Sequence, residues 1–158
     1  MKHSLKIISL LIILFFVAHI LGLFITSQYL DTDTLPLNIE RPDLGPETAL
    51  FSIFIIILIG TALALVLLKF KLFRLWKIWF FLSVFLTLTI SFTVFIPEII
   101  AIILALGFAL WKILRPNVYV HNFTELFIYG ALAAIFVPIL SIWTISLLLV
   151  LISIYDYI

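Results

Sequence analysis

Residues 142–158 read IWTISLLLVLISIYDYI, and this stretch decides how the rest of the chain is interpreted. Apart from Asp156 it carries no charge, so it predicts a membrane helix. At about 1.5 Å per residue, Asp156 lies about 21 Å along a hydrocarbon core about 30 Å thick. A carboxylate at that depth is costly and usually functional, although a helix-end carboxylate that reaches water is the alternative. Asp156 is therefore the leading candidate for a functional residue.

The composition extends this interpretation to the whole chain. The 158 residues are 66% hydrophobic, whereas soluble domains are about 45–50% apolar, so we expect a membrane protein. The net charge of +1 gives no indication of a nucleic-acid partner. The absence of cysteine excludes disulfides and cysteine-based catalysis or metal binding. No phosphate-binding, zinc-binding or nucleophilic-serine motif is present, so we predict no cofactor and no metal.

Six apolar segments predict an all-α, polytopic membrane protein with six transmembrane helices in one membrane domain, residues 1–158. The predicted spans are residues 5–25, 48–68, 75–96, 97–114, 122–137 and 142–158. Pro46-Glu47 and Pro97-Glu98 are typical of helix starts. Residues 126–155 are uncharged and would make one helix about 45 Å long, too long for a bilayer, so Pro138 predicts a break. We interpret the first span as a signal anchor, because its apolar run is too long for a cleaved signal peptide.

Small residues at four-residue spacing predict close helix contacts. They occur in three of the spans: Gly60 and Ala64; Ala101, Ala105 and Ala109; Gly130 and Ala134. The hydroxyl residues of the third span should bond to their own helix or to a neighbour, and these are Thr87, Thr89, Ser91 and Thr93. His19, inside the first span, is interpreted as a hydrogen-bonded packing residue, with a proton relay as the alternative.

Two polar segments allow more than one interpretation. Residues 28–47 are acidic and rich in proline, which predicts an extracytoplasmic hydrophilic loop with little regular structure; cation binding is the alternative, but the spacing matches no calcium loop. Asn122-Phe123-Thr124 matches a glycosylation acceptor. Asn122 and Glu125 also match a capping box at the start of the fifth span. We prefer the cap, because this connection should face the cytoplasm.

Basic residues predict the orientation. With six spans, eight of them fall on the side of the N-terminus: Lys2, Lys6, Lys69, Lys71, Arg74, Lys77, Lys112 and Arg115. Only Arg41 falls on the other side. By the positive-inside rule the chain is an integral multi-pass membrane protein with its N-terminus in the cytoplasm. Asp156 then approaches the cytoplasmic face from within the membrane.

Trp143-Thr144, a seven-residue apolar spacer and Ile152-Ser153-Ile154-Tyr155-Asp156 resemble the sixth transmembrane helix of presenilins, the intramembrane aspartyl proteases. The resemblance implies that Asp156 is one aspartate of a catalytic dyad and that Tyr155 helps to shape the site. It implies transmembrane helices as substrates, in addition to membrane lipids as partners. Signal peptide peptidases have a similar Tyr-Asp motif but the opposite orientation. The short loops resemble those of archaeal members, which implies an archaeal cell membrane.

The sequence also departs from the family pattern. The second aspartate, in a Gly-x-Gly-Asp motif on a seventh helix, and the Pro-Ala-Leu motif are both missing. We therefore expect an N-terminal part that needs a missing C-terminal part carrying the second aspartate and is inactive alone. Two close carboxylates sharing one proton can activate water and protonate the substrate. The alternative from another class is a non-catalytic membrane scaffold or transporter half, with Asp156 in a structural or proton-coupling role.

Overall fold

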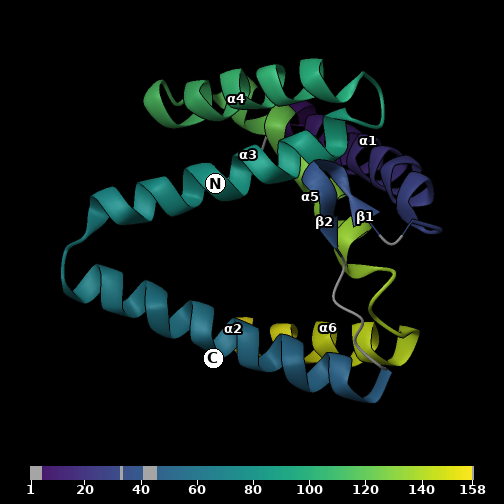
Figure 1. The fold of residues 1–158 in the computed structure, drawn as a ribbon, viewed down its shortest axis with the longest axis vertical. Coiled ribbons are helices and arrows are strands. Elements are labelled where there is room, and N and C mark those ends of the chain that lie inside the picture. Colours follow the sequence, from purple (N-terminus) through teal and green to yellow (C-terminus); the bar gives the residue numbers. More distant parts are fainter. Residues whose placement is uncertain (1–4, 33, 41–45, 158) are drawn as a thin grey trace.

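The computed structural model describes residues 5–32, 34–40 and 46–157 (Figure 1). The described residues form the helices α1 (Leu5–Tyr29), α2 (Pro46–Lys69), α3 (Phe73–Phe92), α4 (Glu98–Leu114), α5 (Val118–Phe136) and α6 (Ile142–Tyr157). A short hairpin between α1 and α2 consists of β1 (Thr34–Leu35), the 3-10 turn η1 (Pro36–Asn38) and β2 (Ile39–Glu40). The chain is therefore predominantly helical, as its sequence predicts.

Four of these helices are long and apolar enough to cross a membrane, over Ile7–Tyr29, Phe51–Lys69, Phe73–Phe92 and Val118–Phe136. With 17 and 16 residues, α4 and α6 are shorter, so crossing by these two stays a prediction. The proline starts are confirmed, because α2 begins at Pro46 and Pro97 directly precedes α4. The fifth helix begins at Val118, four residues earlier than predicted.

The packed centre of the molecule consists of α1, α3, α4 and α5. On α4, the alanines of the predicted stripe are all fully buried: Ala101, Ala105 and Ala109. They lie in one cluster with Val84, Leu88 and Phe92 of α3. Because alanine leaves only a methyl group at the contact, the two helices can approach closely. The predicted close-packing role of this stripe is confirmed.

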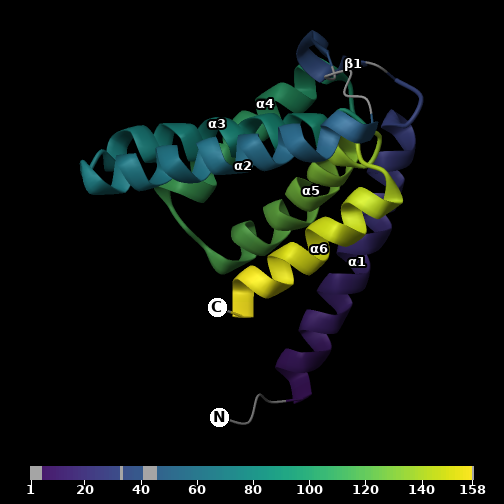
Figure 2. The same ribbon diagram turned by 90° about the horizontal axis from the view of Figure 1, so that it is seen from below.

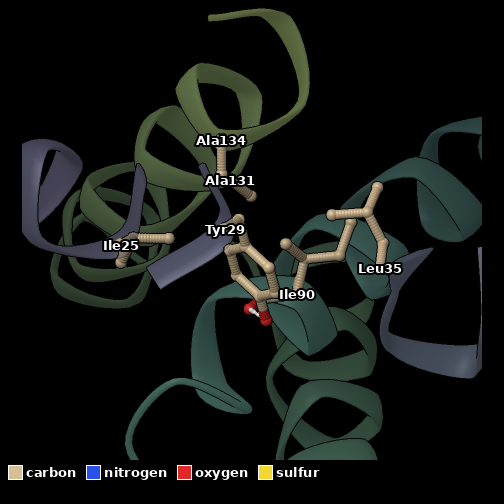
Figure 3. Packing of buried hydrophobic residues seen from close by; sticks show 6 residues of the cluster. All are labelled: Ile25, Tyr29, Leu35, Ile90, Ala131 and Ala134. Carbon is tan, nitrogen blue, oxygen red and sulfur yellow. Dashed lines mark hydrogen bonds between the residues drawn. The ribbon is translucent and has the colours of Figure 1, made fainter. Parts of the chain in front are cut away.

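A second seam joins α1 to α5, which run in the same direction. A Cβ atom placed on Gly130 would lie 2.6 Å from the Cδ1 atom of Ile25 and 3.6 Å from the Cα atom of Gly22. Ile25 is fully buried in a cluster with Ala131 and Ala134 (Figure 3). The small face predicted around Gly130 is therefore confirmed, and its partner is α1.

Hydroxyl groups tie α3 into this centre. The Tyr29 hydroxyl of α1 donates to the Ile90 carbonyl of α3 at 2.8 Å. Figure 3 shows the Tyr29 ring directed toward Ile90. Thr87 and Thr89 donate to carbonyls of their own helix, whereas Ser91 donates to the Phe127 carbonyl of α5. Both predicted uses of these hydroxyls therefore occur.

Outside this centre, α2 and α6 pack little. In Figure 1, α2 diverges from α3 beyond the turn that joins them, and among the described residues α6 makes only sparse contact with other helices. A Cβ atom on Gly60 would meet nothing within 4 Å. The predicted close contact at Gly60 and Ala64 is therefore wrong for this structure, because a cavity of about 300 Å³ separates these two residues from Trp76, Trp79 and Phe80 of α3.

The segment between α1 and α2 is more regular than its composition predicts. Thr34 pairs with Glu40 and Leu35 pairs with Ile39 in an antiparallel hairpin. The Leu37 N–H donates to Oε1 of Glu98 at 3.0 Å. The hairpin therefore lies against the start of α4, and the expectation of little regular structure is wrong for residues 34–40.

Candidate functional site

The structure places the backbone of Tyr155 and Asp156 in the last turn of α6. Their side chains lie outside the part of the chain that the structure describes. Trp143 lies in the first turn of the same helix and is 86% exposed. The stretch that resembles presenilins is therefore carried by one helix, and the role of Asp156 stays a prediction.

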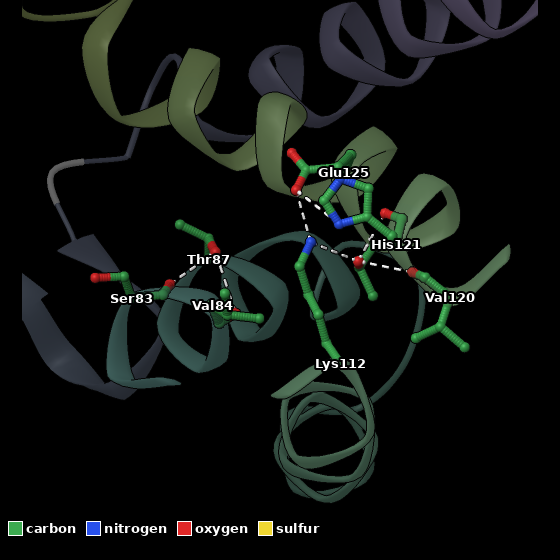
Figure 4. Close-up of polar contacts among 8 residues, drawn as sticks. Ser83, Val84, Thr87, Lys112, Val120, His121 and Glu125 are labelled. Atoms are coloured by element: carbon green, nitrogen blue, oxygen red, sulfur yellow. Dashed lines mark hydrogen bonds and ion pairs between the residues drawn. The ribbon is translucent and has the colours of Figure 1, made fainter. Parts of the chain in front are cut away.

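A buried ion pair joins α4 to α5 (Figure 4). Nζ of Lys112 lies 2.6 Å from Oε1 of Glu125 and donates to Oγ1 of Thr124 at 2.9 Å. The Lys112 side chain is only 4% exposed, and that of Glu125 is 25% exposed. An ammonium group buried to this degree is tolerated only when it is paired and hydrogen-bonded, and both conditions are met here.

The helices position this pair through their own registers. Lys112 lies three residues beyond Ala109, so it continues the buried stripe of α4 toward α5. The Thr124 hydroxyl donates to the carbonyl of Val120 at 2.8 Å, which leaves its lone pairs for the lysine. Oε1 of Glu125 also lies 3.8 Å from Nδ1 of His121, one turn earlier on α5.

The capping box predicted for Asn122 and Glu125 is wrong. The residue that caps α5 is Asn117, whose side chain accepts from the Tyr119 N–H at 2.9 Å. Since the helix starts before Asn122, the N–H group of Asn122 needs no cap, and Glu125 pairs with Lys112 instead. The glycosylation alternative requires Asn122 and Thr124 to lie in an exposed loop. In the structure Asn122 lies within α5 and Thr124 is fully buried.

Sequence reasoning missed Lys112 as a site residue, because it counted this lysine only as an orientation signal. The signal that could have found it is the alanine stripe. Since Ala101, Ala105 and Ala109 face a neighbour, the residue three positions later faces the same way. A lysine on a buried face needs an anion, and Glu125 is the acidic residue of the next helix.

A cavity of about 670 Å³ lies between α1 and α5. Polar side chains in its lining are His19, Thr26, His121, Asn122, Glu125 and Tyr129. Nδ1 of His19 lies 3.3 Å from the backbone carbonyl of Phe15. The imidazole ring of His19 also contacts the phenyl ring of Phe15, with centroids 4.4 Å apart. Both contacts are with the preceding turn of α1 and His19 is exposed, so its packing role stays a prediction; the cavity also brings this residue to the same space as Glu125.

Together these residues can hold a proton or a polar group, and they do not form a metal site. Among the described residues, no three histidine or carboxylate side chains gather closely enough to bind a metal ion. The ion pair of Lys112 and Glu125 is electrically neutral, and one carboxylate oxygen bears both the lysine and the histidine contact. The arrangement therefore suits either helix assembly or proton exchange.

No protein family, curated protein or solved structure matches the chain in comparisons of sequence and fold. The resemblance to presenilins therefore rests on residues 143–156 and on the order of the apolar segments.

Proposed function

We propose that this chain is the N-terminal part of a presenilin-like intramembrane aspartyl protease and supplies one aspartate, Asp156, of its catalytic dyad. The observation that carries the proposal is the pattern of Trp143-Thr144 followed by Ile152-Ser153-Ile154-Tyr155-Asp156 on the sixth helix. Trp143 and Asp156 are thirteen residues apart, so the pattern extends over about 20 Å of helix.

The chemistry requires a second carboxylate. Hydrolysis of a peptide needs one group to activate water and another to protonate the substrate, and two aspartates sharing a proton supply both. Glu125 is poorly suited to be that partner, because its carboxylate is already engaged by the Lys112 ammonium group, 2.6 Å away. The second aspartate would therefore come from a segment beyond these 158 residues, and a transmembrane helix would be the substrate.

The test replaces Asp156 with asparagine in the parent protein that carries a downstream Gly-x-Gly-Asp helix. Asparagine keeps the shape but cannot take up or release a proton, so cleavage of a transmembrane substrate in vesicles should fall by at least about 10²–10⁴-fold. Asp31→Asn, at an exposed position beyond α1, is the matched control and should leave cleavage unchanged. Normal cleavage by the Asp156→Asn protein, at equal folded yield, would contradict the proposal.

The same assay examines the 158-residue chain alone. Among the residues that the structure describes, Asp156 is the one aspartate within an apolar helix, so we expect no cleavage without the second carboxylate. Cleavage by the purified chain that Asp156→Ala abolishes would show that a partner carboxylate lies within these residues.

A second candidate function is a non-catalytic transporter half, and the buried ion pair is the observation that favours it. Ionisable residues within membrane helices often mark proton or ion pathways. Glu125 also lines the cavity between α1 and α5. In that case Glu125→Gln should change proton flux across vesicles containing the chain, and Asp156→Asn should change it too where Asp156 has the proton-coupling role. For a protease, Asp156→Asn should abolish cleavage, and neither variant should change proton flux.

A further inference from the structure

The turn between α2 and α3 concentrates positive charge. Four basic side chains lie in it or at the ends of the two helices beside it, and all four are exposed: Lys69, Lys71, Arg74 and Lys77. No acidic residue occurs between Glu47 and Glu98, and within the described part of the chain no ion pair joins any of the four to a carboxylate. In Figure 1 the turn lies at an edge of the molecule, away from the packed centre. Within the described residues, therefore, an anionic partner would not have to displace an ion pair.

Lys71 occupies a backbone position that usually holds glycine. Its φ of 54° is in the left-handed region. The Lys71 N–H donates to the Leu68 carbonyl, and the Leu72 N–H donates to the Leu67 carbonyl, so α2 ends in a Schellman motif. Glycine adopts this conformation without steric cost, so reversal of the chain alone does not account for a lysine. What the lysine adds is a positive charge at the point where the chain turns.

The turn also borders an open hollow of about 330 Å³, which is lined by residues 71–75. Two of these five residues, Lys71 and Arg74, are basic. Arginine can donate two parallel hydrogen bonds to a phosphate group, and lysine binds phosphate as a point charge. The hollow is therefore suited to a phosphate group that both cations contact.

The position of the hollow along the helices identifies the source of the phosphate. The segment of α2 that can cross a membrane ends at Lys69, and that of α3 begins at Phe73, so the turn would lie among the head groups of a bilayer. Large aromatic side chains beside it are exposed, with Phe70 at 65%, Phe73 at 55% and Trp76 at 39%. Tryptophan is enriched at this depth, and the phenyl rings would be covered by lipid chains. Cations mixed with exposed aromatic rings at this depth favour a membrane lipid over a nucleic acid.

We propose that the α2–α3 turn binds the phosphate of an anionic membrane lipid, with Lys71 and Arg74 as direct contacts and Lys69 and Lys77 as flanking charges. In the predicted orientation the turn faces the cytoplasmic leaflet, where anionic lipids produce a negative surface potential. The positive-inside rule requires only an excess of cations in a connection, whereas this site requires them at particular positions. The site is independent of Asp156 and of the proposed protease activity.

Native mass spectrometry of the purified 158-residue chain in detergent measures this binding. Phosphatidylglycerol, which is anionic, and phosphatidylcholine with the same chains, which is zwitterionic, are titrated separately. The wild-type chain should retain phosphatidylglycerol more tightly. Each basic residue near an anionic membrane surface contributes about fivefold in affinity, so Lys71→Gly combined with Arg74→Gln should weaken retention of phosphatidylglycerol about 25-fold. Retention of phosphatidylcholine should not change. Because glycine suits the left-handed position, this variant keeps the turn.

A matched pair of variants tests the location of the site. Arg74→Gln and Arg115→Gln each remove one exposed arginine, and the second is at the end of α4. Only Arg74→Gln should weaken retention, by about fivefold, while Arg74→Lys should keep most of it. Equal loss in the two glutamine variants, equal retention of the two lipids, or full retention by the double variant would overturn the proposal.

Two competitors separate the lipid from other sources of phosphate. Because the chains of the lipid remain in the detergent micelle beside the turn, inorganic phosphate at the same concentration should not displace phosphatidylglycerol. A single-stranded oligonucleotide should not displace it either. Displacement by inorganic phosphate would identify a free anion as the ligand, and displacement by the oligonucleotide would identify a nucleic-acid surface. Either result would overturn the proposal.

Discussion

At the residue scale, Lys112 shows how one charged side chain is accommodated among apolar helices. Its ammonium group is buried, and it bonds to Thr124 and Glu125 of the next helix. Breaking a buried ion pair by removing one partner typically costs about 3–5 kcal/mol, whereas replacing both partners with apolar residues is often neutral. The pair therefore fixes how α4 meets α5 more than it adds to stability.

This gives a prediction for Lys112→Met. The variant leaves the partly buried Glu125 carboxylate without its cation, so the free energy of unfolding should fall by about 3 kcal/mol. The double variant Lys112→Met with Glu125→Leu should recover most of that loss. Unfolding in detergent can be followed by tryptophan fluorescence, with Lys69→Met at an exposed position as the control. If the double variant is no more stable than Lys112→Met, the loss of stability does not come from the unpaired Glu125 carboxylate.

At the element scale, the sequence predicts the helices better than their contacts. Helix starts at Pro46 and Glu98 follow from local backbone chemistry, and the structure has them there. Contacts depend on which helix faces which. The alanine stripe around Ala105 packs closely against α3. The pair at Gly60 and Ala64 has the same spacing, but a Cβ atom on Gly60 would meet nothing within 4 Å. For the same reason the pairing of Lys112 with Glu125 was not predicted, because it joins residues of two helices.

The seam between α1 and α5 allows a sharp test at this scale. In Gly130→Ala the new methyl group would lie 2.6 Å from Cδ1 of the fully buried Ile25, so the end of the Ile25 side chain must move within a packed seam. Overpacking of this kind costs about 1–3 kcal/mol. Ile25→Val removes the clashing atom and should rescue Gly130→Ala in the double variant. Gly22→Ala is the control, because its Cβ meets only Gly130 at 3.9 Å. Thermal unfolding of the four variants measures the coupling, and additive losses would contradict the close seam.

At the scale of the whole molecule, orientation in the membrane rests on charge. Figure 2 shows α2 and α3 running across the direction of α1, so the arrangement of the helices does not define one membrane normal. The basic residues 69, 71, 74 and 77 lie at or near the turn between α2 and α3, and they are half of the eight basic residues that give the positive-inside signal. Lys112 contributes less to the positive-inside signal than the sequence indicates, since its charge is buried and paired with Glu125.

The last prediction concerns this topology and uses the absence of native cysteines. Single cysteines are placed at Asp31, Leu72, Pro97 and Val118, all exposed, and labelled in intact cells with a membrane-impermeant maleimide. With the N-terminus in the cytoplasm and α4 crossing the membrane, positions 31 and 97 should react from outside. Positions 72 and 118 should react only after permeabilisation.

Labelling of position 118 from outside would mean that α4 does not cross, because its two ends would then lie on one side. Labelling of position 72 from outside would reverse the orientation, and Asp156 would then approach the extracytoplasmic face, as the resemblance to presenilins does not allow.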